Sequence, residues 1–263
     1  TPTCYHNCMV YPPTFTEGVP AGIILSGIVA LLNAGSAGVF SVFLLSRWRL
    51  MNNIRHQYTS FWALMFILWL GISVRYLIVI LQIPNPTLFW VNEIILQSSI
   101  FASAIPLLLY LSNTIFNSRR ITVMMAVYST IGYIVGVWFL VQPDGISQGA
   151  LTSFTVEPGI NNKSAILFAI LAGSALVLVI FDTSRRIIKW FRHRDTEFPY
   201  ETLFSLSLMV YIILGSIDQL NAISGWPIVA FRVLYVGVFL VGYLVTSEDE
   251  RRHETYIITS GQV

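Results

Sequence analysis

Long apolar runs separated by short polar segments account for most of the chain. A helix that crosses a membrane needs about 17–25 mostly apolar residues, and seven runs reach this length. They are continuous and do not alternate in short segments, so they predict helices rather than the strands of a membrane barrel. We place the seven helices at 21–46, 60–83, 87–112, 120–142, 164–183, 202–222 and 227–247.

This pattern predicts an all-α integral membrane protein with a seven-helix transmembrane bundle. The bundle occupies residues 21–247, after an N-terminal segment at 1–20 and before a short tail at 248–263. Composition agrees, because 55% of the 263 residues are hydrophobic and only 11% are charged, whereas a soluble domain carries roughly 25% charged residues.

The basic residues of the loops predict the orientation of the bundle. If the loops alternate between the two sides, Lys163 is alone on one side. The other side receives Arg47, Arg49, Arg55, Arg119, Arg120, Arg185, Arg186, Lys189, Arg192, Arg194, Arg251 and Arg252. Lys and Arg collect on the cytosolic side of membrane proteins. We therefore expect a multi-pass protein of the cell membrane with its N-terminus outside and its C-terminus in the cytosol.

Both cysteines lie before the first helix, in the segment TPTCYHNCMVYPP. An exterior segment is in an oxidising space, which favours a small disulfide between Cys4 and Cys8. The set Cys4, His6, Cys8 and Met9 also matches ligands that suit copper(I) or zinc, and unpaired thiols or an intermolecular bridge are further alternatives.

Two loops carry other candidate sites. Asn162, with Lys163 and Ser164, fits the N-glycosylation pattern on the exterior side. On the cytosolic side Arg185, Arg186, Lys189, Arg192 and Arg194 alternate with large apolar residues. This pattern is typical of an interfacial extension of the fifth helix, which would contact anionic lipid or a cytosolic partner.

Several function classes lack their required residues. The last predicted helix has no lysine, so covalent retinal is not expected, and the four histidines lie outside the spans, so haem within the bundle is not expected either. We find no metalloprotease, phosphate-loop or serine-hydrolase motif. We therefore expect no enzyme activity and no cofactor. The expected partners are the lipid bilayer and a protein in the membrane or at the cytosolic face, not nucleic acid.

Five charged residues lie within the predicted spans: Arg75, Glu93, Asp182, Asp218 and Arg232. We expect Asp182 to reach water at the cytosolic end of its helix. At 1.5 Å per residue, the other four lie about 5–9 Å outside the midpoints of their helices. A charge at such depth is costly unless it is compensated, and these four charges sum to zero.

Short connections indicate which of these charges pair. The turn PNPT joins the second and third helices, and SGWP joins the sixth and seventh. Helices with short connections are antiparallel neighbours, which predicts the pairs Arg75–Glu93 and Asp218–Arg232. The two pairs can also belong to one network.

Aromatic and polar residues accompany the four charges at the same depth. Trp90, Glu93 and Gln97 share one helix face by their spacing, and Tyr235 lies close in depth. Two interpretations stay open. The group forms a ligand pocket that opens outward, or it is a structural ion-pair network that fixes the helices relative to one another.

The chain also resembles a known family, the seven-helix N-terminal sensor region of bacterial and archaeal histidine kinases. The resemblance runs from about Phe61 to Val245. It rests on FWALMFILWLGISVRYL, PTLFWVNEIILQSSIFASAIPLLLYLSN, FTVEPG and RDTEFPYETLFSLSLMVYIILGSIDQL. It implies an outward-facing ligand site, but it assigns no binding residue. Such regions are usually followed by a cytosolic kinase or cyclase and none follows here, so the resemblance implies a free-standing version that needs a partner.

These observations lead to two main expectations of function. The first is a receptor-like sensor that binds a small ligand outside and signals through a separate cytosolic protein. The second is an accessory or structural subunit of a larger membrane complex. A transporter or channel component is a third alternative.

Overall fold

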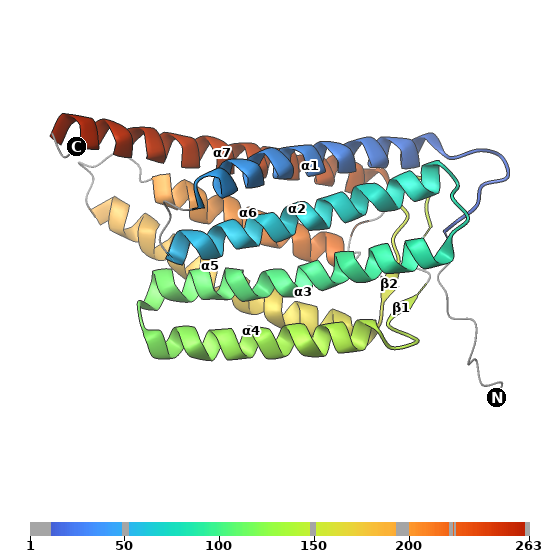
Figure 1. Cartoon of the computed structure of the whole chain (residues 1–263), viewed down its shortest axis with the longest axis horizontal. Coiled ribbons are helices and arrows are strands. Elements are labelled where there is room, and N and C mark those ends of the chain that lie inside the picture. Colours follow the sequence, from blue (N-terminus) through green and yellow to red (C-terminus); the bar gives the residue numbers. More distant parts are fainter. Residues whose placement is uncertain are drawn as a thin grey trace.

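The protein is a bundle of α-helices in the computed structural model, which describes residues 12–48, 53–147, 151–192, 200–220, 223 and 225–260. Its elements are α1 (Ala21–Ser46), α2 (Asn53–Ile80), α3 (Pro86–Phe116), α4 (Arg119–Leu140), β1 (Ile146–Ser147), β2 (Gly159–Ile160), α5 (Asn162–Arg192), α6 (Tyr200–Gln219) and α7 (Trp226–Ser260). Figure 1 shows the helices aligned along the long axis, with β1 and β2 at one end.

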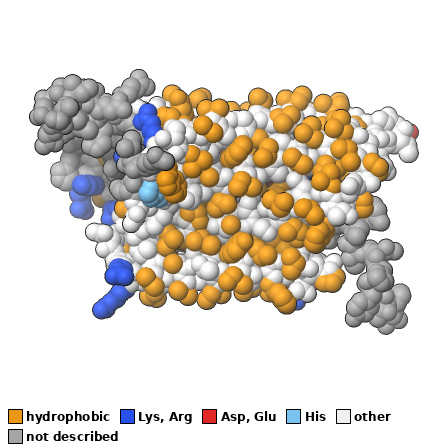
Figure 2. All heavy atoms as spheres, in the orientation of Figure 1, with side chains coloured by type: hydrophobic (Ala, Val, Ile, Leu, Met, Phe, Trp, Pro, Cys, Tyr) orange, Lys and Arg blue, Asp and Glu red, His pale blue; other side chains and the backbone are white. Residues whose placement is uncertain are grey.

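Helix lengths and apolar surface fit a membrane bundle. In the part of the chain that the structure describes, α1 to α5 and α7 are long and apolar enough to cross a membrane, whereas the apolar stretch of α6, Ser205–Gln219, is shorter. Figure 2 shows apolar side chains along the length of the bundle. An outer surface of this kind is stable when it contacts lipid rather than water.

The two ends of the bundle differ in charge. We call the end with β1 and β2 the hairpin end. We call the opposite end the basic end, because most of the described Lys and Arg side chains lie there: Arg47, Arg55, Arg119, Arg120, Arg185, Arg186, Lys189 and Arg192. Figure 2 shows blue side chains gathered at this end, which is on the left. Lys163, near the start of α5, is at the hairpin end.

Neighbouring helices follow the chain order. Contacts join α1 to α2, α2 to α3, α3 to α4, α4 to α5, α5 to α6 and α6 to α7, while α1 also packs on α7 and α3 on α5. The predicted neighbours α2–α3 and α6–α7 are therefore both confirmed. The turn between α6 and α7 includes Gly225 with a φ of 75°, a conformation that glycine adopts at no steric cost.

Several helices extend beyond their predicted bounds. The first helix has the predicted bounds, but α2 begins at Asn53 rather than 60, α5 ends at Arg192 rather than 183, and α7 continues to Ser260 rather than 247. Hydropathy locates only the apolar part of a helix. Backbone hydrogen bonds can continue the helix into neighbouring polar residues. The continuation of α5 agrees with the predicted extension, and most of the predicted tail at 248–263 is helix.

The connection from α4 to α5 contains a hairpin of β1 and β2, which crosses one end of the bundle. Ile146 in β1 pairs antiparallel with Ile160 in β2. The tip of the hairpin reaches α1, where the Ser26 hydroxyl donates a hydrogen bond of 2.5 Å to the Phe154 carbonyl. A Cβ at Gly22 would lie 2.4 Å from the Ser153 carbonyl oxygen, so the close contact of this tip with α1 requires glycine.

Some predictions concern residues that lie outside the described part of the chain. These are the Cys4–Cys8 disulfide, the alternative metal site that includes His6 and Met9, and the contact with lipid or a partner at Arg194.

Candidate functional site

The first feature of the site is a buried ion pair between α2 and α3. Arg75 donates to Glu93 twice, from Nε to Oε1 and from Nη2 to Oε2, each at 2.6 Å. The side chains are only 5% and 0% exposed. Pro86 begins α3 and the Asn85 side chain caps it, accepting from the Leu88 amide at 3.0 Å. This compact turn holds the two helices side by side, and the pair is the one predicted from sequence.

The second feature is an ion pair between α6 and α7. Arg232 donates from Nη2 to Asp218 Oδ1 at 2.8 Å and from Nε to Oδ2 at 3.2 Å. Its Nη1 donates to the Tyr76 hydroxyl of α2 at 2.9 Å. The predicted Arg232–Asp218 pair is therefore present, and Tyr76 links it to the helix that carries Arg75.

The hairpin joins the two pairs into one network. Arg232 Nη2 also forms an ion pair with Glu157, and Arg75 Nη1 donates to the Val156 carbonyl at 3.4 Å. Glu157 was not predicted as a site residue. The available signal was an acid followed by Pro158 and Gly159, shortly before the fifth span.

The addition of Glu157 changes the charge of the cluster. We define the charge cluster as Arg75, Arg232, Glu93, Glu157 and Asp218. Two guanidinium groups face three carboxylates, so the charge cluster has a net charge of −1 when every group is ionised, not the zero that the four helical residues give. Burial raises the pKa of the Glu157 carboxyl above its ordinary value; Arg232 acts against this shift and Asp218 adds to it.

A cavity of about 120 Å³ lies beside the charge cluster. Its walls come from α2, α3, α5, α6, α7 and the hairpin. The charged and amide side chains that line it are Arg75, Gln97, Glu157, Asp218, Gln219 and Arg232. The Gln219 amide donates to Gln97 Oε1 at 2.7 Å. This bond joins α6 to α3 within the cavity wall. Most other lining residues are apolar, so the cavity has one polar region and a larger apolar region.

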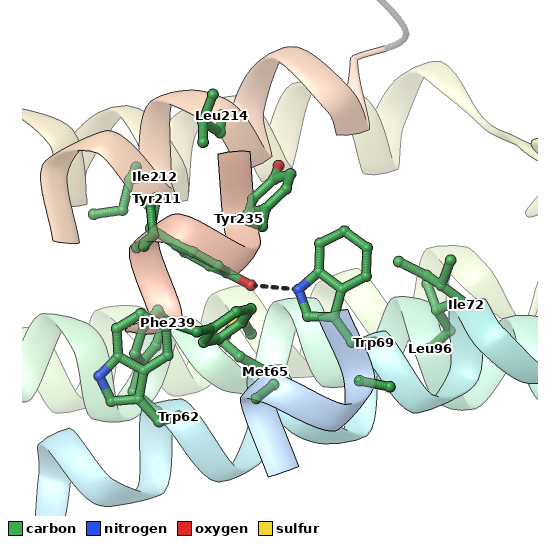
Figure 3. Close-up of a cluster of buried hydrophobic side chains, with 14 of the residues drawn as sticks. Trp62, Met65, Trp69, Ile72, Leu96, Tyr211, Ile212, Leu214, Tyr235 and Phe239 are labelled. Carbon is green, nitrogen blue, oxygen red and sulfur yellow. Dashed lines mark hydrogen bonds between the residues drawn. The ribbon is translucent and has the colours of Figure 1, made fainter. Parts of the chain in front are cut away.

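Aromatic side chains form the cavity wall on the side of the charge cluster that faces the basic end. Trp69 and Tyr235 both line the cavity, with ring centroids 4.8 Å apart and ring planes at 65° to each other. The Trp69 indole nitrogen donates to the Tyr211 hydroxyl at 3.1 Å, as Figure 3 shows. Tyr211 also lines the cavity and packs edge-on against Phe239 and Trp62, which lie farther along the bundle core.

Some of the residues predicted for a pocket line the cavity, and others do not. Gln97 and Tyr235 line the cavity, and both are buried. Trp90 is half-buried and lies outside the cavity lining. It shares a face with Glu93, but it lies about one turn nearer the start of α3, beyond the level of the cavity. The indole of Trp69 on α2 takes the place that was expected for Trp90.

A second polar cluster lies at the basic end, and it corrects the prediction that Asp182 reaches water. Asp182 is only 1% exposed. Its carboxylate accepts from Arg185 Nη2 at 3.2 Å, from Arg186 Nε at 2.8 Å and from the Ser205 hydroxyl of α6 at 2.8 Å. The carboxylate thus has enough donors to replace water, which allows its burial.

The remaining predicted sites are on the surface. Lys189 and Arg192 are exposed on the last turns of α5, where a lipid headgroup or a partner has access to them. Asn162 is exposed at the first position of α5, while Asn161 caps this helix by accepting from the Ser164 amide at 2.7 Å.

The titratable side chains of the cavity lining are arginines, carboxylic acids and tyrosines. The described lining residues include no His, Cys or Lys, which are frequent bases and nucleophiles in active sites. Within the described residues, no group of three or more His, Cys, Asp or Glu is arranged to hold a metal ion. Comparisons of the chain with models of protein families, with curated proteins and with solved structures found no significant match.

Proposed function

We propose that the protein is a receptor-like membrane sensor that binds a small molecule in the cavity at the hairpin end and signals through a separate cytosolic protein. The observation that carries this proposal is the cavity of about 120 Å³, which is apolar over most of its wall and polar beside Arg232, Asp218 and Glu157. Ligand sites typically combine apolar walls with a few polar groups that fix orientation.

The proposal includes seven spans in the cell membrane, with the N-terminus outside. The basic residues at one end of the bundle support this orientation, because such residues collect on the cytosolic side. Helix α6 has 20 residues, about 30 Å at 1.5 Å per residue, which matches the hydrocarbon thickness of a bilayer. In this orientation the cavity lies toward the outer side and α7 ends in the cytosol.

The resemblance to histidine-kinase sensor regions supports a signalling role and a protein partner. Two features at the basic end are suitable for contact with such a partner. Helix α7 continues past its apolar part as far as Ser260, and Lys189 and Arg192 are exposed on α5.

A cavity-filling variant tests whether the cavity holds a ligand. Ala172 on α5 lines the cavity, whereas Ala169 on the same helix is exposed on the outer surface. We expect wild type and Ala169→Phe, purified in mild detergent, to be monomers that retain a small molecule detectable by mass spectrometry. Ala172→Phe should lose it. Equal retention by all three chains would contradict the proposal.

The same purification tests the alternative function as an accessory subunit. One observation favours that function, because every guanidinium nitrogen of Arg75 and Arg232 already has a partner in the protein, as in a structural network. Co-purification with other membrane subunits in a fixed ratio, without a retained small molecule, would support the accessory function and contradict the receptor.

A further inference from the structure

The polar region of the cavity has spare hydrogen-bond acceptors. Arg75 and Arg232 use all of their nitrogen atoms within the protein. A carboxylate can accept about four hydrogen bonds, and Glu157 accepts one and Asp218 two in the bonds described above. Both acids line the cavity. Of the five N–H donors on each arginine, Arg75 uses three and Arg232 uses four in these bonds. More acceptors than donors are therefore spare, and a ligand that donates hydrogen bonds finds the most partners here.

The net charge of the charge cluster also favours a ligand that donates hydrogen bonds, in particular a cation. With all five groups ionised, its charge is −1, and an uncompensated charge inside a membrane bundle is costly. A proton on Glu157 is one way to neutralise it, in agreement with the raised pKa of that carboxyl. A cation bound beside Glu157 is the other way.

The rings around this region favour a cation as well. Trp69 and Tyr235 both line the cavity beside Arg232 and Asp218. An ammonium group within about 6 Å of the face of an aromatic ring is attracted by it, most strongly by the ring of Trp. The same cavity thus offers spare carboxylate oxygens and aromatic rings, the two groups that ammonium compounds prefer.

The apolar region limits the size of the ligand. It is lined by side chains such as Leu96, Ile100, Phe101, Phe168 and Leu171. The cavity volume of about 120 Å³ is close to that of an apolar cavity of about 150 Å³ that accepts benzene. The space therefore fits one ring or a short chain, not a lipid tail.

We propose that the cavity binds a small organic cation, whose ammonium head lies beside Glu157 and Asp218 and whose ring-sized apolar body lies among the side chains of α3 and α5. This ligand class rests on the proposed function, since it assigns chemistry to the same cavity. Binding of the cation replaces a proton on Glu157. The charged and titratable groups that interact with that carboxyl are Arg75 of α2, Asp218 of α6, and Arg232 and Tyr235 of α7. Glu93, Tyr76 and Tyr211 interact in turn with Arg75, Arg232 and Asp218.

Three compounds with the same ring test the charge of the ligand. The full chain in lipid nanodiscs is titrated by calorimetry with 2-phenylethylamine, 2-phenylethanol and 3-phenylpropionate at neutral pH. We expect the amine to bind at least about tenfold more tightly than the alcohol, since hydrogen bonds to charged groups are worth about that factor, and the carboxylate to bind least. Binding of the alcohol or the carboxylate as tightly as the amine overturns the ligand class, and so does no binding of the amine.

Variants test the position of the ligand. Glu157→Gln keeps the shape of the side chain and should weaken binding of the amine at least about tenfold, while Asp144→Asn, an exposed acid of the same interhelical segment, should not. Equal effects of the two variants, or undiminished binding to Ala172→Phe, overturn the proposal. If Glu157→Gln does not fold, the comparison of the three compounds on the wild-type chain decides.

Failure of the ligand class is separable from failure of the proposed function. In one outcome, the wild-type chain binds no amine and still retains a small molecule that Ala172→Phe loses. This result would support the proposed receptor function and contradict the proposed ligand class. A chain that retains no molecule and binds none of the three compounds would contradict both proposals.

Discussion

The Arg75 guanidinium and the Glu93 carboxylate are almost without solvent contact, so each depends on the other for compensation. Loss of one partner from a buried pair leaves an unpaired charge and costs about 3–5 kcal/mol. We therefore expect Arg75→Leu or Glu93→Leu alone to lower the thermal midpoint in detergent more than the double variant does. Scanning fluorimetry measures the three midpoints against wild type.

A matched control for the loss of one arginine is Arg120→Leu, because Arg120 is exposed at the start of α4 and should change stability little. If the effects of the two single variants simply add in the double variant, the two side chains do not depend on each other, and direct pairing would be contradicted.

Glu157 gives the stability a dependence on pH whose sign follows from its pKa. Burial raises that pKa above the ordinary value of 4.5, so above pH 4.5 the folded chain binds more protons than the unfolded chain. The free energy of unfolding then falls as the pH rises through the folded pKa. We expect the difference in thermal midpoint between wild type and Glu157→Gln to decrease from pH 4.5 toward neutral pH.

The control for this pH dependence is Asp144→Asn, because Asp144 is an exposed acid in the same interhelical segment. Its midpoint should follow that of the wild type across the same pH range. A wild-type advantage over Glu157→Gln that grows with pH would mean that Arg232 outweighs burial, and it would reverse the assigned direction.

The sequence predicted those ion pairs whose residues lie on helices, where the depth of a residue and the neighbouring helix can both be inferred. Arg75 and Glu93 lie at similar depth on helices joined by a short turn, as do Asp218 and Arg232, so their pairing followed from helix geometry. Glu157 was missed because a loop residue has no depth until the path of its loop is known. Trp90 was misassigned because a shared helix face does not fix the level along the helix.

At the scale of elements, the hairpin is the part that holds Glu157 in the charge cluster. Its tip lies so close to α1 that a Cβ at Gly22 would meet the Ser153 carbonyl oxygen at 2.4 Å. We expect Gly22→Leu to detach the tip and to accelerate amide hydrogen exchange across residues 146–160, since exchange reports local opening. Affinity for a cavity ligand should fall with it.

Gly35→Leu on the same helix is the matched control, because nothing lies within 4 Å of a Cβ at that position. It should leave hydrogen exchange in the hairpin at the wild-type rate. Equal acceleration by both variants would show a general effect on α1 rather than loss of the contact with the tip.

The helices were predictable from sequence and the hairpin was not, for a physical reason. Each helix satisfies its backbone within its own sequence, so an apolar run is enough to locate it. The hairpin is fixed by distant contacts instead, such as the bond between Ser26 and Phe154, which are 128 positions apart. Sequence therefore predicted a long loop, but not its path across the end of the bundle.

At the scale of the whole molecule, the orientation in the membrane decides which compartment the cavity faces. Positions for labelling are Asp144→Cys at the hairpin end, Ile223→Cys between α6 and α7, and Arg120→Cys at the basic end, in a chain with Cys4→Ser and Cys8→Ser. Because basic residues stay in the cytosol, we expect an impermeant maleimide to label the first two on intact cells. Arg120→Cys should react only after permeabilisation.

This experiment also tests whether α6 spans the membrane and whether the proposed ligand reaches the cavity from outside. Labelling of both Asp144→Cys and Ile223→Cys from outside requires α6 to cross, since α5 and α6 must together return the chain to the side where α5 began. Labelling of Asp144→Cys without Ile223→Cys would leave α6 short of the outer surface. Labelling of Arg120→Cys on intact cells would reverse the bundle, turn the cavity toward the cytosol and contradict the proposal of an exterior ligand.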